Sequence, residues 1–188
     1  MELLIMIFST QAEWAHWLEE NHATAKGIWL RMYKKNSGLT SINYAQALDE
    51  ALCYGWIDGT VKSYDDTSFI QKFTPRRPKS NWSEKNTQHV ERLTAASKMK
   101  PAGIREVDAA KADDRWEKAY HSGSNAAVPD DFLAALKKNK KAKTFFDTLN
   151  KQNLYAIYFR LQTAKSPETR AKRIATFIEM LARQEKFH

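Results

Sequence analysis

The period of the hydrophobic pattern changes along the chain, and this change limits the folds open to it. In residues 28–33 large apolar side chains alternate around Arg31, and residues 61–64 and 68–74 form two further short runs of β-type residues. Beyond residue 126 the apolar residues instead recur at spacings of three and four, which is the period of an amphipathic helix. A sheet-forming first part followed by a helical second part predicts an α+β protein with a small mixed layer at its N-terminus.

Capping patterns predict where helices interrupt this layer. Two residue pairs have the spacing of a helix start: Thr10 with Glu13, and Asn43 with Gln46. The second helix is predicted to run to about Tyr54, after which Gly55 and Gly59 bracket residues 56–58 as a tight exit. Residues 3–8 are interpreted as a strand or a buried lead-in.

Serine and proline mark the expected helix starts in the rest of the chain. These starts are Asn81 or Ser83, Pro101, Pro129 and the pair Ser166-Pro167. Residues 121–125 (HSGSN) have the composition of a linker. We therefore divide the chain into a sheet-and-helix domain over residues 1–80, a helical segment over residues 81–125 and a C-terminal helical region over residues 126–188.

The net charge of +8 is unevenly distributed. Residues 70–105 carry 9 basic and 2 acidic side chains, a balance of +7, and residues 134–188 carry 13 and 4, a balance of +9. The other two stretches, residues 1–69 and 106–133, each have a balance of −4. Either these zones attract one another across the fold, or the basic ones bind anions such as phosphate, nucleic acid or an acidic partner.

Several functional classes lack their signatures in this sequence. The chain contains no glycine-rich nucleotide loop, no HExxH or CxxC motif and no GxSxG motif, and its five histidines are not spaced as metal ligands. We therefore expect neither a cofactor nor a metal site. The single cysteine excludes an internal disulfide, and no apolar run is long enough for a membrane span. Because the short apolar start also lacks the features of a signal peptide, we expect a cytoplasmic protein without membrane insertion.

The second predicted helix combines acidic side chains with a thiol. Asp49 and Cys53 lie one turn apart on the face opposite its apolar stripe, Glu50 is adjacent, and Trp56 and Asp58 follow at the exit. One interpretation is a cleft that contains a thiol, carboxylates and an indole. Nearby carboxylates and a helix C-terminus raise the pKa of a thiol, which argues against a nucleophile. The alternative is a small buried cysteine with exposed acids near it.

The segment over residues 73–86 interleaves basic and aromatic residues. Its candidate ligand-binding residues are Arg76, Arg77, Lys79 and Trp82, with Ser83 and Asn86 at the helix start behind them. The arginines can bind phosphate or carboxylate in a bidentate manner, the indole can stack on a ring, and the helix start can add backbone N–H groups. Alternatively, the arginines pair with the acids of the second helix and its exit, and the tryptophan anchors the loop in the core.

Basic residues also cluster in the C-terminal region. Lys165, Arg170, Lys172 and Arg173 fall in or near the first turns of the last predicted helix, where positive charge opposes the helix macrodipole. They are interpreted as a solvated basic face or as a surface for an anion. The lysines of residues 137–143 are interpreted as exposed surface.

Several motifs resemble those of a known family. The matching segments are residues 51–59 (ALCYGWIDG, close to an ALCFGWIDG block), residues 73–86 (FTPRRPKSNWSEKN, close to an FTPRR…S.WS..N block), residues 99–120 and residues 164–174. The similarity to the YdeI/OmpD-associated family spans residues 8–186, with Asp114 where a glycine is expected. The resemblance implies a link to bacteriocin protection or a porin, and a YjbR/CyaY-like α+β fold for the N-terminal part. It supplies no catalytic residues.

From the residues and the resemblance together we expect a binding protein for an anionic or aromatic small molecule. Its pocket is predicted between Trp56 and Asp58 at the helix exit and the loop over residues 76–82. Asp49, Glu50, Cys53, Ser83 and Asn86 are expected behind the ligand-binding residues. Two alternatives stay open: an enzyme that uses Asp49, Asp58 or Cys53 in the same cleft, and a nucleic-acid or protein-partner module that uses the basic helices.

Overall fold

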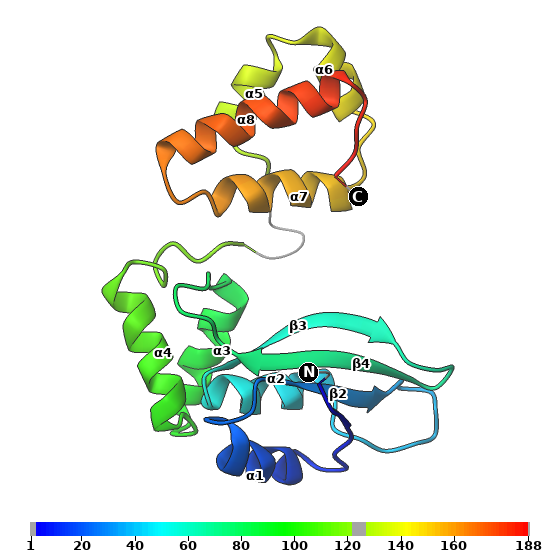
Figure 1. Ribbon diagram of the computed structural model, residues 1–188, viewed down its shortest axis with the longest axis vertical. Coiled ribbons are helices and arrows are strands. Elements are labelled where there is room, and N and C mark those ends of the chain that lie inside the picture. The colour runs from blue at the N-terminus through cyan, green and yellow to red at the C-terminus, as the bar shows by residue number, and fades with distance from the viewer. Residues whose placement is uncertain (1–2, 122–126, 188) are drawn as a thin grey trace. The chain divides into compact units, whose positions relative to one another are not determined.

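The computed structural model describes residues 3–121 and 127–187 of the chain (Figure 1). Its first part contains β1 (Ile5–Met6), α1 (Gln11–Asn21), β2 (Ile28–Tyr33), α2 (Tyr44–Cys53), β3 (Trp56–Ser63), β4 (Ser68–Pro75), α3 (Glu84–Ala95) and α4 (Pro101–Ala112). The second part contains α5 (Asp130–Leu136), α6 (Lys140–Phe146), α7 (Lys151–Gln162) and α8 (Pro167–Ala182). The predicted α+β class is therefore confirmed.

Contacts within the chain divide it into two compact units, residues 1–119 and residues 120–188. Of the predicted linker over residues 121–125, all but His121 lies outside the described residues. In the part of the chain that the structure describes, no helix combines the length and the apolar character that crossing a bilayer requires.

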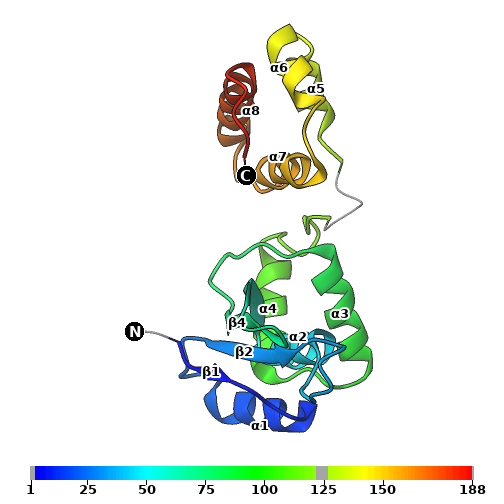
Figure 2. The same ribbon diagram turned by 90° about the vertical axis from the view of Figure 1, so that its right-hand side faces the viewer.

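Four strands of the described residues form one sheet in the order β1-β2-β4-β3. β1 runs parallel to β2, whereas β2 and β3 both pair antiparallel with β4. Ile28 lies opposite Phe73 and Leu30 opposite Gln71, so these residues point to the same face of the sheet. All four are buried, and α1 and α2 lie along this side of the sheet (Figures 1 and 2).

Aromatic residues fill the space between the sheet and α1. Trp14 of α1 is fully buried, and its ring lies 5.9 Å from that of Phe73 in β4 and 5.3 Å from that of Trp17. Its indole N–H donates a hydrogen bond to the carbonyl of Ala47 at 3.0 Å, which links α1 to α2. Burying a side chain of this size stabilises the fold by about 3 kcal/mol, so this cluster is a main support of the first unit.

α2 begins and ends where the sequence predicts, but the residues that follow it form a different structure. The Asn43 side chain accepts from the Gln46 backbone and the Gln46 side chain accepts from the Asn43 backbone, each at 3.0 Å. The prediction that residues 56–58 form a tight exit is wrong, because Trp56 is the first residue of β3. Gly55 has a φ of +74°, and this left-handed residue turns the chain from the helix directly into the strand.

α3 and α4 pack against α2 and complete the first unit. Ser83 caps α3 and Pro101 is the first residue of α4, as the sequence predicts. Their buried side chains join the same core as the sheet; these are Val90 and Leu93 of α3 with Val107 and Ala110 of α4. The backbone N–H of Lys100 donates to the carbonyl of Cys53 at 3.1 Å, so the start of α4 is attached to the end of α2.

The second unit is a helical cluster around its own core. The apolar residues that recur at spacings of three and four in α7 and α8 are buried or partly buried, and they pack with α5. The buried members of this core include Phe132, Leu136, Ile157, Leu161, Phe177 and Leu181. Ser166 caps α8 by accepting from the backbone N–H of Thr169 at 3.2 Å. α6 is not among the predicted helices. It carries part of the lysine run over residues 137–143, starts from the Asn139 cap and buries Ala142.

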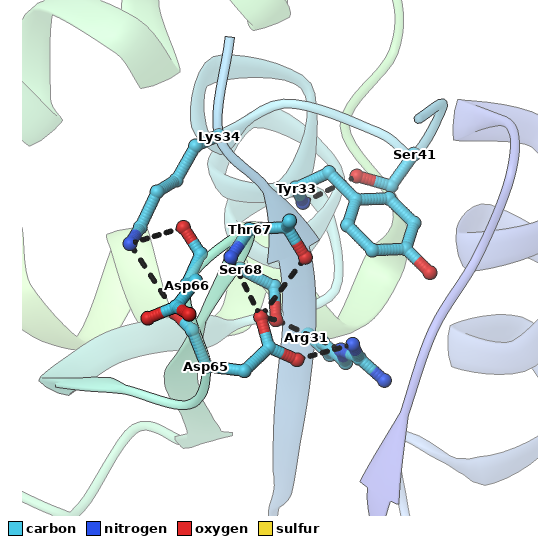
Figure 3. A network of polar contacts seen from close by, with 8 residues as sticks. All are labelled: Arg31, Tyr33, Lys34, Ser41, Asp65, Asp66, Thr67 and Ser68. Atoms are coloured by element: carbon cyan, nitrogen blue, oxygen red, sulfur yellow. Dashed lines mark hydrogen bonds and ion pairs between the residues drawn. The ribbon is translucent and has the colours of Figure 1, made fainter. Parts of the chain in front are cut away.

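A polar network closes the turn between β3 and β4 (Figure 3). One carboxylate oxygen of Asp65 accepts from the hydroxyl of Ser68 at 2.7 Å and from the backbone and hydroxyl of Thr67 at 2.9 and 3.0 Å. The other accepts from the Arg31 guanidinium at 2.6 Å. These hydrogen bonds, with that of Ser68 contributing most, and the charge of Arg31 lower the pKa of Asp65 to about 2.

We predict that Asp65→Asn lowers the melting temperature at neutral pH. The difference in melting temperature between the variant and the wild type should become smaller in acid. The folded-state pKa lies below the value of about 3.9 for an unfolded aspartate. The carboxylate therefore stabilises the fold fully above that value, and this stabilisation is lost as the pH falls through 2. Melting curves between pH 7 and pH 2 test this. Asp66→Asn is the control, because Asp66 joins the network through its backbone carbonyl. A difference that is constant with pH would contradict the prediction.

Candidate functional site

A cleft of about 280 Å³ lies where β3 begins and β4 ends. Its lining comes from the α2–β3 junction, the end of β4, the first turns of α4 and the segment after α1. The polar and aromatic side chains that line it are His22, Tyr54, Trp56, Arg76, Arg105 and Glu106. Two of the residues predicted for a ligand site, Trp56 and Arg76, therefore lie at one cleft.

Arg76 is held in place on several sides. Its backbone N–H donates to the carbonyl of Gly55 at 3.0 Å, and its guanidinium carbon lies 3.4 Å from the centre of the Trp82 ring. The guanidinium also donates to the Ser80 hydroxyl and the Asn81 carbonyl, each at 3.4 Å. The residue is 7% exposed, and a desolvated cation on an indole is stabilised by about 2 kcal/mol. Arg76 therefore lines the cleft as a rigid, largely buried cation.

Trp56 and Tyr54 supply the aromatic part of the lining. The indole N–H of Trp56 donates to the carbonyl of His22 at 3.0 Å, and the Trp56 ring packs edge-on against Trp17 at 5.8 Å. The ring of His22 lies 5.2 Å from that of Tyr54. Because Trp56 is 1% exposed and packed within the core, the cleft exists without a ligand to shape it.

Two glycines let the elements around the cleft approach one another. A Cβ atom on Gly55 would lie 3.0 Å from the carbonyl oxygen of Ala102, and one on Gly103 only 2.3 Å from that of Cys53. No side chain fits at Gly103 at that distance, so the first turn of α4 lies directly against the end of α2. This contact brings Arg105 to the cleft.

The other residues predicted for ligand binding lie away from this lining. Arg77 and Lys79 are exposed, and Lys79 adopts a left-handed conformation with a φ of +60°. Asp58 accepts a hydrogen bond from the Tyr44 hydroxyl at 2.9 Å. Trp82 is 2% exposed and contacts the guanidinium of the cleft arginine, so it supports the site from within the core.

The residues expected behind the ligand site take part in contacts between helices. Asp49 accepts from Arg92 of α3 at 2.6 Å, and Glu50 accepts from a glutamine of α1 at 2.6 Å. The hydroxyl of Ser83 accepts from the backbone N–H of Asn86 at 3.3 Å as the cap of α3. These side chains hold α1, α2 and α3 in position.

Cys53 is buried, with 1% of its surface exposed. Burial raises the pKa of its thiol to about 12, and the negative charges of Glu50 and Asp49 add to this. A thiol in this setting is not a nucleophile at neutral pH. It packs as a small apolar group in the core of the first unit.

Four of the polar and aromatic lining residues, His22, Tyr54, Arg105 and Glu106, were not identified as site residues from the sequence. The helix start at Pro101 is visible in the sequence, but which of its side chains face a cleft depends on how α4 packs. The sequence did contain one indication of this packing. Gly103 lies in the first turn of the predicted helix, and a glycine there indicates a close approach to another backbone.

The charges around the cleft favour an anion. Two guanidinium groups line it with one carboxylate, and guanidinium groups bind carboxylate and phosphate oxygens through charge-assisted hydrogen bonds.

Within residues 3–121 and 127–187, no three His, Cys, Asp or Glu side chains come together as ligands for a metal ion.

The fold and the cleft define an α+β protein with a small polar cleft in its first unit and a separate helical unit after it. Residues 6–106, more than half of the chain, match a family model described as a domain of unknown function (DUF8412), and residues 125–184 match one described as Bacteriocin-protection, YdeI or OmpD-Associated. The chain thus belongs to the DUF8412 family, and its second unit is similar to the YdeI/OmpD-associated family. Neither a curated protein nor a solved structure matches it.

We predict that iodoacetamide does not alkylate Cys53 in the folded protein at pH 8. With a pKa of about 12, on the order of one thiol in 10⁴ is ionised at that pH, and the side chain is buried. Intact-mass measurement with and without denaturant tests this, since the unfolded chain should gain one adduct. Rapid stoichiometric labelling without denaturant would show that the thiol is reactive after all.

Proposed function

We propose that the chain is a binding protein whose cleft at Arg76 and Arg105 accepts a small anionic molecule. The observation that carries this proposal is the fixed position of the Arg76 guanidinium. It lies against the Trp82 ring, and Arg76 also lines the cleft. A guanidinium that is already immobilised loses little conformational freedom when a ligand binds. We further propose that the protein acts in the cytoplasm, in keeping with its single cysteine.

The size of the cleft restricts the ligand. A volume of about 280 Å³ lies at the lower end of the range for ligand pockets, which is about 300–1,000 Å³, so a dinucleotide is too large. Glu106 lines the same cleft, and its carboxylate can accept a hydrogen bond from a hydroxyl or amino group of the ligand. Tyr54 and Trp56 line the cleft but are almost fully buried, so they offer a ligand little surface for stacking. A compact carboxylate or phosphate compound with a donor group, with at most a single ring, fits these requirements.

The alternative of an enzyme has less support. Cys53 is buried with a raised pKa, and Asp49 is engaged by Arg92. Asp58 accepts from a tyrosine hydroxyl of α2. None of these three residues is part of the described lining of the cleft, so the candidate catalytic groups and the candidate ligand site are separate.

A second candidate function is favoured by the charge of the C-terminal unit. Residues 120–188 contain 13 lysine and arginine residues against 6 aspartate and glutamate residues, a balance of +7 out of a total of +8. A unit with this charge attracts nucleic acid or an acidic protein partner independently of the cleft.

We predict that Arg105→Gln weakens the binding of small anions about tenfold. Arg105 is exposed at the rim of the cleft, so its loss removes one charge-assisted hydrogen bond, of about 1.5 kcal/mol, without disturbing the core. Inorganic phosphate and a set of small hydroxy- and amino-carboxylates are the probes. The NMR resonance of the Trp56 indole N–H reports binding, because this group donates to the carbonyl of His22 and both residues line the cleft.

Arg77→Gln is the matched control, since it removes the same charge from an exposed position one residue after Arg76. It should leave affinity unchanged, and both variants should melt within a few degrees of the wild type. Equal weakening by the two variants would show a general charge effect and reject the cleft as the site. A wild-type chain that binds none of the probes would reject the proposed ligand class.

A further inference from the structure

The face of the sheet turned away from α1 and α2 carries alternating aromatic and basic side chains. Residues at every second position of β2 point to it, and neighbouring strands add to them. We call the following set the outer-face patch: Trp29, Arg31, Tyr33, Lys62, Tyr64 and Lys72. No helix of residues 3–119 lies over this face (Figures 1 and 2).

Strand register places these residues together. Trp29 lies opposite Lys72, and both Arg31 and Lys62 lie opposite Ile70 from the two sides of β4. Because directly paired residues share a face, these side chains point the same way. The patch therefore extends across β2, β4 and β3, with one further ring, that of Tyr64, directly after β3.

Cations lie on the rings of the patch. The amino group of Lys62 is 4.9 Å from the centre of the Trp29 ring, and the guanidinium carbon of Arg31 is 4.6 Å from that of Tyr64 and 5.3 Å from that of Tyr33. These long side chains cover the middle of the sheet, so that Ile70 is only 8% exposed. Tyr64 itself is 47% exposed, which makes its ring accessible to a partner.

We propose that the outer-face patch binds single-stranded nucleic acid. Unpaired bases would stack on the three aromatic rings, while Lys62 and Lys72 would contact the phosphates. A four-stranded sheet that presents aromatic rings on its open face is a recurrent arrangement for binding unpaired bases. This site is distinct from the anion cleft, which lies where β3 begins and β4 ends and includes no residue of the patch.

Two acidic residues lie at one end of the patch. Asp65 and Asp66 lie in the β3–β4 turn, and the charge of Asp65 is compensated by Arg31 at 2.6 Å. Lys34 also lies there and donates to the two backbone carbonyls of that turn (Figure 3). The nucleic acid is therefore expected to cross the sheet over Lys62 and Lys72, with Tyr64 as the last stacking platform before the turn.

The cation–π pairs do not exclude this role. They explain how the face is covered in the free protein, but an exposed pair of this kind contributes less than a base stacked on the same ring. A base can displace the Lys62 amino group from Trp29, and the released lysine can then contact the adjoining phosphate.

The test uses fluorescence anisotropy of labelled ten-nucleotide oligo(dT) and oligo(U) with the full chain at low salt. Trp29→Ala and Tyr64→Ala should each weaken binding about tenfold, because each removes one stacking platform. A double variant that combines Lys62→Gln and Lys72→Gln should reduce the slope of log affinity against log salt concentration by about 1.4. Each phosphate contact contributes about 0.7 to this slope for a single strand. The two oligonucleotides distinguish DNA from RNA as the preferred ligand.

Lys137→Gln with Lys138→Gln is the matched control, because it removes two charges from exposed positions of the basic C-terminal unit. If this control weakens binding and the aromatic variants do not, the nucleic acid binds the C-terminal unit and the proposal is wrong. Equal competition by a duplex of the same length would also reject it, because stacking requires unpaired bases. Tyr64→Ala decides the matter if Trp29→Ala fails to fold, since Tyr64 is largely exposed.

Discussion

The backbones of α2 and α4 touch at Cys53 and Gly103, and the arrangement of the first unit follows from this contact. A Cβ atom at position 103 would lie 2.3 Å from the Cys53 carbonyl oxygen, so only glycine permits the approach. The same contact places Arg105 near the end of β4. Gly55, two residues after Cys53, turns the chain into β3 with a φ of +74°. Two glycines thus determine where the cleft forms.

Much of the fold was predictable because its signals are local. The capping pair Asn43 with Gln46 starts α2, and the alternation in residues 28–33 marks β2, since each pattern depends on residues within one turn or one strand. α6 could not be predicted in this way. It has seven residues, too few to be stable as an isolated helix, and it exists because Ala142 and its apolar neighbours pack into the core of the second unit.

The candidate site was predictable only in part, for a related reason. Local composition singled out Arg76, because cations, prolines and a tryptophan in one short loop are unusual. It could not separate Arg76 from Arg77, although one is buried at the cleft and the other is exposed. Neither could it identify Arg105, which follows Arg76 by 29 positions and reaches the cleft through helix packing. Sites assembled from distant segments leave little trace in any one of them.

The chain uses one interaction, a cation on an aromatic ring, in two settings with different consequences. At Arg76 and Trp82 both partners are almost fully buried, so the pair contributes about 2 kcal/mol and the guanidinium is held in one position. At Lys62 and Trp29 the lysine is exposed, where such a pair contributes about 0.5–1 kcal/mol and exchanges readily with water or a ligand. A fixed cation suits a site that selects a small anion by geometry, whereas an exchangeable one suits a surface that accommodates a flexible polyanion. The difference in burial is therefore what distinguishes the two proposed sites.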